Sequence, residues 1–300
     1  MAGLFASDNR SHTSEIDDMH EKISDWIYTT SNSIDIFFSG SDKEIPSKKE
    51  SYLDTSFDTY AESYRPLRYR FNVSLRLRLP RTERKLNLVL EDFKNTSSVD
   101  LPNSGALADT LRNNDYLLGI QYRRHESKYT RIRYGTGIRF RRYTPDPYLL
   151  LYLGKSYYFS KSWELLLSNK LRYFADYRLD NRAEASIIKV INERLRFSYR
   201  NIYRFIENDN DRNEIINTVS LEQFISPKTG LCYSISIYSS GDSGSVFKLG
   251  YYYAGLRLRH YYYRHWAYYQ VEGGTILREE NNFKPAGRVA FKVGLVFGKE

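Results

Sequence analysis

Apolar and polar residues alternate along most of this chain. Between Leu67 and Leu79 every odd-numbered position is apolar, and every even-numbered position is Arg, Asn or Ser. The same alternation returns over Thr130–Arg141 and Arg194–Phe205. A period of two places successive side chains on opposite faces of a β-strand. Because these runs are well above the usual strand length of about five or six residues, they predict long strands with one apolar and one polar face.

Weaker alternation fills the intervals and brings the number of predicted strands to 14. The predicted strands span 52–64, 67–79, 84–92, 115–124, 130–141, 148–159, 163–178, 183–192, 194–205, 213–225, 230–239, 245–259, 264–279 and 286–297. Connections opposite the chain ends are expected at Phe93–Asn114, Thr144–Pro147 and Leu179–Arg182, among others. An even count with both ends on one side is what a closed single-chain barrel requires. Twelve strands are the alternative.

The period changes to that of a helix near the N-terminus. Apolar residues at three- and four-residue spacings predict an amphipathic helix from about Thr13 to Phe38, which Gly40 can end. The domain organisation expected is a periplasmic helix and linker over residues 1–50 and a barrel over 51–300. The apolar face of this helix packs against the barrel end, plugs the barrel, or docks a periplasmic partner through Ile16 to Phe38.

Composition decides what kind of sheet protein this is. The chain has 28 Tyr and 16 Phe, yet only 41% of its residues are hydrophobic, and its mean hydropathy is −0.60. No apolar run is longer than Tyr148–Leu153, which excludes membrane-spanning helices of about 20 apolar residues. A transmembrane β-barrel remains possible, because its apolar surface occupies only every second residue. A soluble β-sandwich is the alternative fold.

The final strand carries a resemblance to a known class. Over Arg288–Phe297 the odd positions from Val289 to Phe297 are all apolar. The chain thereby resembles Gram-negative outer-membrane β-barrel proteins, although Gly298, Lys299 and Glu300 follow the closing Phe, and no named subfamily is matched. The resemblance implies a bacterial outer-membrane location, contact with lipid and lipopolysaccharide, and recognition of Phe297 by the barrel-assembly machinery. We also expect that a signal peptide has been removed from this chain.

Aromatic residues cluster beside the predicted turns. Tyr and Trp favour membrane interfaces because the ring prefers hydrocarbon and its polar group prefers water. We therefore predict two aromatic girdles. They comprise Tyr157, Tyr158, Trp163, Tyr261, Tyr262 and Trp266 at the rim holding the chain ends, and Tyr143 and Tyr148 at the other.

The polar face of the strands is rich in arginine, and the formal net charge is +9. An Arg in the middle of the lipid costs about 2–4 kcal/mol, so arginines opposite the apolar face must point inward. The predicted pore-lining residues are Arg68, Arg70, Arg76, Arg78, Arg131, Arg133, Arg139, Arg141, Arg194, Arg196, Arg200 and Arg204. These arginines either pair with acids in a stiff wall or line an electropositive pore for anionic small solutes.

Other chemistry finds little support in the sequence. Cys232 is the single cysteine, and the five histidines show no metal-binding spacing with a third ligand. No catalytic, cofactor or metal site is predicted, and nucleic-acid binding does not explain apolar faces on every strand. The sequence therefore predicts a passive outer-membrane channel for anionic solutes. The alternatives are a non-conducting structural or assembly barrel and an outer-membrane lipid hydrolase.

Overall fold

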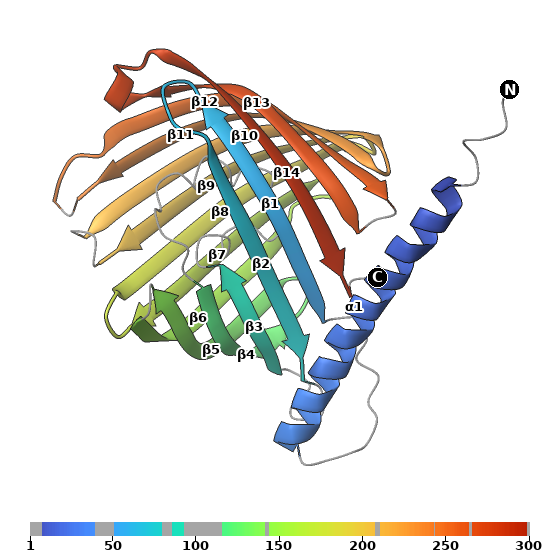
Figure 1. Ribbon diagram of the computed structural model, residues 1–300. Coiled ribbons are helices and arrows are strands. Elements are labelled where there is room, and N and C mark those ends of the chain that lie inside the picture. The colour runs from blue at the N-terminus through green and yellow to red at the C-terminus, as the bar shows by residue number, and fades with distance from the viewer. Residues whose placement is uncertain are drawn as a thin grey trace, which may run out of the picture.

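Fourteen antiparallel strands close into a barrel (Figure 1). The computed structural model describes residues 8–39, 51–79, 86–92, 116–141, 144–207, 211–242, 244–263 and 266–298. Each strand pairs with its neighbours in sequence, and the last strand pairs with the first through a register that sets Leu53 opposite Phe297. The predicted barrel and its strand count are therefore confirmed. Pairing of the last strand with the first satisfies the backbone groups at the two edges of the sheet, as a barrel in lipid requires.

One long helix precedes the strands. The elements are α1 Asp8–Ser39, β1 Tyr52–Glu62, β2 Arg68–Arg78, β3 Leu86–Asp92, β4 Tyr116–Glu126, β5 Thr130–Arg141, β6 Thr144–Tyr158, β7 Trp163–Phe174, β8 Arg178–Asn192, β9 Leu195–Ile206, β10 Arg212–Ser226, β11 Thr229–Gly241, β12 Lys248–Tyr263, β13 Ala267–Arg278, the short η3 Glu279–Asn281, and β14 Pro285–Phe297. We call the end of the barrel where β1 begins and β14 ends the terminal rim.

Two predicted connections lie inside strands. Residues 144–147 belong to β6, and residues 179–182 belong to β8. Their polar composition suggested turns, but their acids are partners for inward-facing arginines. Asp146 lies directly opposite Arg139 across the β5–β6 pair, and Asp180 lies directly opposite Arg172 across the β7–β8 pair. The strands therefore extend further toward the opposite rim than their apolar positions indicate.

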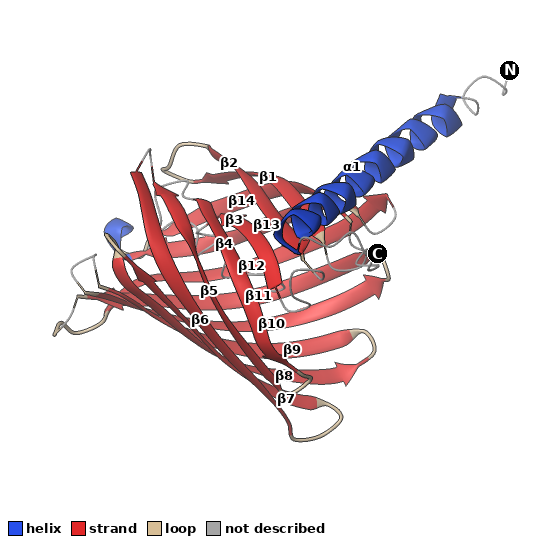
Figure 2. Cartoon of the chain, turned by 90° about the horizontal axis from the view of Figure 1, so that it is seen from below, coloured by secondary structure: helices blue, strands red, loops and turns tan. Residues whose placement is uncertain are grey.

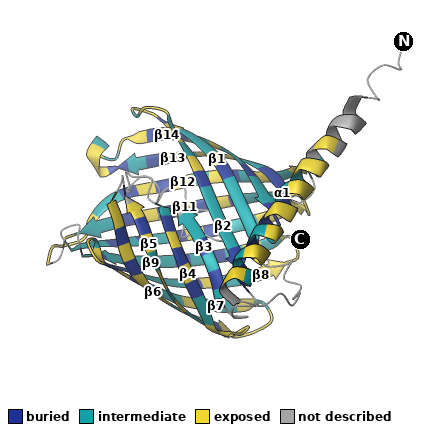
Figure 3. Cartoon of the chain, turned by 60° about the horizontal axis from the view of Figure 1, so that its bottom comes forward, coloured by how far each residue is buried: buried dark blue, intermediate teal, exposed yellow. Residues whose placement is uncertain are grey.

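The two faces of the wall differ in exposure (Figure 3). In β6, Leu149 is 63% exposed, whereas Tyr148 and Leu150 on either side of it are each 5% exposed. The exposed face carries apolar side chains, and the covered face carries most of the charged and small polar side chains. Because the sheet is closed, the covered face lines the interior, which we call the lumen, and the exposed apolar face lies outside.

Several tyrosine rings lie inside the barrel against glycines. Tyr148 is close to Gly119 and Gly137, so that a Cβ atom added at either glycine would collide with its side chain. Glycine opposite a large ring lets an inward tyrosine pack flat on the backbone of the neighbouring strand. The placement of Tyr148 in a girdle is wrong, because the β6 alternation puts it on the inward face beside buried Phe174. Part of the tyrosine excess therefore fills the interior.

Helix α1 lies outside the barrel at the terminal rim, and its N-terminal end extends past the barrel (Figures 1 and 2). It contacts β2, β1 and β14. None of the helices in the described part of the chain is long and apolar enough to cross a membrane.

Candidate functional site: the inner wall

The inward faces of β2–β5 form a region that we call the arginine sector. Arg68, Arg70, Arg76 and Arg78 occupy alternate positions of β2, on the same face as buried Asn72. Arg131, Arg133 and Arg139 occupy the equivalent face of β5. The backbone alternation that exposes Leu and Phe outside is what turns these guanidinium groups toward the lumen.

Neutral groups contribute many of the contacts in the arginine sector. The Arg76 guanidinium lies 5.6 Å from the ring centre of Tyr52, and its ion pair with Glu91 is long at 3.8 Å. Arg139 lies 4.2 Å from the ring centre of Tyr177. Arg70 Nε donates to the Asn72 side-chain oxygen at 2.5 Å. Aromatic faces and amides hold an arginine in place without cancelling its charge.

Carboxylates lie within ion-pair distance of arginines both in the arginine sector, where Glu126 is 2.7 Å from Arg133 and 3.1 Å from Arg123, and in β7–β10. Arg204 donates to both oxygens of Asp180, at 2.8 and 3.1 Å, and Arg172 lies 3.6 Å from the same carboxylate. Glu184 lies between Arg182 at 3.2 Å and Arg200 at 3.4 Å. Opposite charges alternate across this part of the wall, as in a cross-strand ladder.

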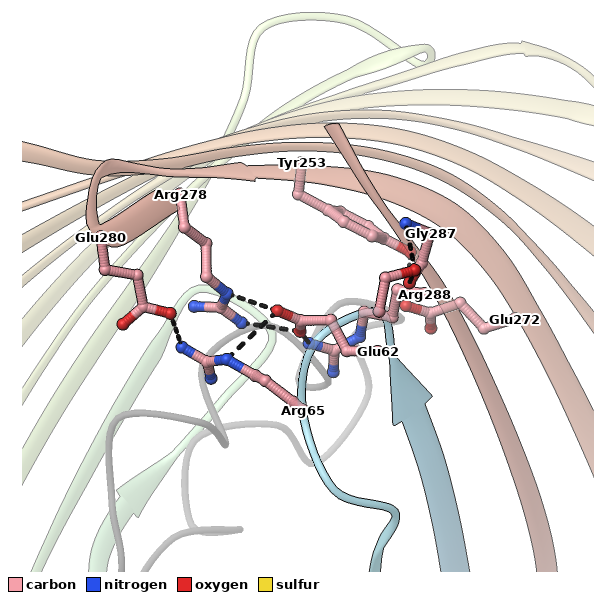
Figure 4. A network of polar contacts seen from close by, with 9 residues as sticks. Glu62, Arg65, Tyr253, Glu272, Arg278, Glu280, Gly287 and Arg288 are labelled. Atoms are coloured by element: carbon pink, nitrogen blue, oxygen red, sulfur yellow. Dashed lines mark hydrogen bonds and ion pairs between the residues drawn. The ribbon is translucent and has the colours of Figure 1, made fainter. Parts of the chain in front are cut away.

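A third group of contacts joins β12, β13, β14 and β1, which we call the paired sector (Figure 4). Glu62 accepts two hydrogen bonds from Arg278, at 2.7 and 2.9 Å. Arg288 lies 3.6 Å and Arg65 3.4 Å from the same carboxylate. Glu272 accepts from the Tyr253 hydroxyl at 2.6 Å and from Arg257 Nε at 3.0 Å. Each acid in this network is surrounded by donors, which makes it a stiff, charge-compensated part of the wall.

Not every predicted pore residue lies on the inner wall. Arg194 lies in the exposed turn between β8 and β9, because β8 ends at Asn192 and β9 begins only at Leu195. Arg196 is inward but near the terminal rim, 3.6 Å from Glu222. Arg141 ends β5, and its side chain lies outside the described residues.

The predicted girdle at the terminal rim separates into two orientations. Tyr157, Trp163 and Tyr262 are exposed on the outward face, and Lys189 Nζ lies 5.0 Å above the Trp163 ring. By strand alternation, Tyr158 and Tyr261 share the inward face at the same rim. Trp266 stacks on His20 of α1, with ring centres 4.3 Å apart. Tyr143 lies outside the described residues.

Sequence reasoning missed several members of the inner wall. Arg182, Arg257 and Arg278 were not predicted, nor were the acids Asp180 and Glu214. Arg257 alternates with Leu256 and Leu258, so extending the period of two through β12 would have found it. Asp180 was missed because its segment was assigned to a connection. Within the described residues, no group of three or more His, Cys, Asp or Glu is arranged to hold a metal ion.

A cavity of about 460 Å³ lies on the outer wall and is separate from the lumen. It is lined mainly by outward residues of β6–β9, including Ala183, Ala185 and Asn201. Asn201 donates to the Asn217 side chain at 2.8 Å. The cavity therefore belongs to the exposed outer face, where two small alanines leave a depression.

The comparisons with known proteins support the fold. No protein-family model matches the chain, and no curated protein sequence matches it. Among solved structures, a loop-deletion form of OmpT, an outer membrane protein of Vibrio cholerae, is similar with a TM-score of 0.51 and 12% identity, over 83% of this chain and 98% of that chain. OmpT of Vibrio cholerae expressed in the outer membrane gives 0.50 and 10% identity, over 83% and 97%. The outer membrane channel DcaP of Acinetobacter baumannii gives 0.47 and 9% identity, over 82% and 96%.

The class that these findings define is the bacterial outer-membrane β-barrel. The closed sheet, the apolar outer face and the similarity to OmpT agree on this class. The identities are low, so the similarity is one of fold, and what the lumen does must be argued from its own residues.

Proposed function

We propose that this protein is a passive outer-membrane channel for anionic solutes, and that the arginine sector is its selective surface. The observation that carries the proposal is the presence of two arginine pairs on the inward face of β2, Arg68 with Arg70 and Arg76 with Arg78, which Asn72 and Ser74 separate. Alternate residues of a strand are about 6.7 Å apart. Two like charges at that distance repel by about 0.6 kcal/mol in water but by about 2.5 kcal/mol at an effective dielectric constant of 20. Such pairs favour a hydrated lumen that admits anions.

The charge balance of the sector supports the same proposal. The described inward positions of β2–β5 hold eight arginines and two acids. The arginines are Arg68, Arg70, Arg76, Arg78, Arg123, Arg131, Arg133 and Arg139, and the acids are Glu91 and Glu126. Two further acids of the flanking strands, Asp58 of β1 and Asp146 of β6, lie opposite Arg70 and Arg139. A wall with this excess lowers the free energy of a carboxylate, phosphate or sulfate group inside the lumen. A barrel of 14 strands is also wider than the eight-stranded barrels that side chains fill.

The second candidate function is a non-conducting structural barrel. The specific observation in its favour is the density of ion pairs in β7–β10 and in the paired sector, where acids neutralise the arginines. A barrel stiffened in this way all around its wall would need no permeant solute.

Conductance measurements in planar bilayers distinguish the two candidates. Under a salt gradient, the channel proposal predicts steady conductance with a reversal potential shifted from zero toward the equilibrium potential of the anion. Changing Arg70, Arg76 and Arg78 together to Gln should shift the reversal potential toward zero, because these changes remove three positive charges from the inward face of β2. No conductance, or cation selectivity in the unaltered protein, would refute the proposal.

A matched triple variant controls for the loss of net charge. Lys161, Arg194 and Lys228 are exposed in turns at the terminal rim, and their change to Gln removes the same charge away from the β2 arginines. This variant should keep most of the anion preference. If the two triple variants shift the reversal potential equally, selectivity arises from overall charge rather than from the arginine sector.

A further inference from the structure

Helix α1 is fixed on the barrel by its buried face. Ile27 is fully buried against Leu77 and Phe297. Polar contacts flank this apolar contact: the Ser31 hydroxyl donates to the Arg78 carbonyl at 2.6 Å, and the Tyr28 hydroxyl donates to the Gly298 carbonyl at 2.8 Å. The helix is therefore docked along the wall by specific contacts rather than tethered loosely beside it.

The residues beneath the helix belong to the outward face of the wall. Leu77 alternates with the inward Arg76 and Arg78, and it is only 2% exposed where Ile27 packs on it. The contacts run from the end of β2, across β1, to Val296 and Phe297 of β14. The helix thus crosses the strand ends along the terminal rim and continues the outer, lipid-facing surface of the barrel (Figure 3).

A second apolar face of α1 is exposed. Met19, Trp26 and Phe37 are 53%, 58% and 81% exposed. They are seven and eleven residues apart, so at about 100° per residue they form one line along the helix. This line lies about a quarter turn from the line of Ile27 and Ile34, which touches the barrel. The opposite side is polar and exposed, with Asp18, Glu21 and Asp25.

We propose that α1 is an interfacial membrane helix whose Met19, Trp26 and Phe37 insert into the lipid at the terminal rim. The three sides of the helix match the three surroundings at that place: the barrel wall, the lipid and the aqueous phase. Lipid is the occupant because the exposed line is continuous with the lipid-facing wall that the helix covers. Trp26 also has the amphipathic ring that favours the headgroup level. The proposal requires a barrel in a membrane and does not depend on the channel function.

The fluorescence of Trp26 tests this proposal directly. The chain has three tryptophans, so changing Trp163 and Trp266 to Phe leaves Trp26 as the single reporter, and Phe at 266 keeps an aromatic ring against His20. The protein is reconstituted into phosphatidylcholine vesicles whose acyl chains carry bromine either near the headgroup or near the chain end. We expect the Trp26 emission to lose intensity, more with bromine near the headgroup than near the chain end.

A variant with the reporter on the polar side is the matched control. In it, Trp26, Trp163 and Trp266 are changed to Phe and Asp25 is changed to Trp, which moves the ring by one residue, about 100° around the helix. This reporter should keep its intensity and emit at longer wavelength. Heat-modified gel mobility confirms that both barrels are folded. Equal emission from the two reporters, or no loss from Trp26 with either brominated lipid, would overturn the proposal and favour a protein partner on this face.

Discussion

The arginine sector and the paired sector contain the same residue types, but their arginines have different partners. In the paired sector Glu62 is enclosed by Arg278, Arg288 and Arg65. In the arginine sector the cations outnumber the acids, and Arg76 and Arg139 lie over aromatic rings. On the channel proposal, the number of arginines in a wall does not by itself decide its selectivity. Ion pairs occur in both sectors, as Arg133 and Glu126 show at 2.7 Å, so the sectors differ in the ratio of cations to acids.

The two sectors also differ in what holds the neighbouring strands. Across β14, β1 and β13, charged contacts cross strand boundaries and join residues 216 positions apart in sequence. Across β4, β5 and β6, the Tyr148 ring lies against Gly119 and Gly137. We infer that charge pairing is the main stabilising contact of the paired sector and that ring packing contributes to the arginine sector.

The largest effect is expected from Glu62→Gln. Removing the charge of a carboxylate that is 3% exposed leaves the surrounding guanidinium groups without their common counter-charge. Breaking a buried pair in this way costs about 3–5 kcal/mol. The measurement is urea unfolding of the barrel in lipid vesicles. Glu280→Gln is the control, because Glu280 is 56% exposed where it pairs with Arg65, and a surface pair contributes about 0–1 kcal/mol. Equal losses for both variants would show that Glu62 does not organise the paired sector.

An intermediate effect is expected from Gly137→Ala in the arginine sector. The added Cβ would lie 2.8 Å from a Tyr148 ring carbon and against the backbone of β4. Overpacking of this kind costs about 1–3 kcal/mol. Gly273→Ala is the matched control, because nothing lies within 4 Å of its added Cβ. The free energy of unfolding should fall for Gly137→Ala alone. A barrel that tolerates both changes would refute the ring-packing explanation.

The alternation of residues is enough to predict the barrel but not its internal contacts. The strand over Leu67–Leu79 can be predicted from its own sequence, because the alternation of apolar and polar residues is visible within the segment. Strand ends were less predictable near Asp146 and Asp180, since the polar residues there satisfy arginines on neighbouring strands rather than a turn. The girdle position predicted for Tyr148 is wrong for a related reason. With the strand predicted to begin at residue 148, the sequence does not indicate whether the Tyr148 side chain lies on the inward or the outward face.

Contacts between distant residues were beyond the reach of the sequence. The enclosure of Glu62 by Arg278 and Arg288 depends on the β1–β14 closure and its register. The helical period of α1 predicted an amphipathic helix and left its partner open. Its position on the outside of the rim is set by Ser31, Tyr28 and His20, whose hydrogen bonds to backbone carbonyls of the barrel have no local pattern.

The smallest effect is expected from Glu91→Gln. This variant tests the comparison of the two sectors by removing an acid from the arginine sector. Glu91 lies 3.8 Å from Arg76, a longer contact than the hydrogen bonds between Glu62 and Arg278. Its loss should lower the free energy of unfolding by about 1 kcal/mol or less, which is the range of weak ion pairs. Because the change removes an acid from the arginine sector, the reversal potential should move slightly further toward the equilibrium potential of the anion. A loss of stability as large as that of Glu62→Gln would mean that the arginine sector is charge-compensated too, and that the two sectors do not differ in the way their charges are held.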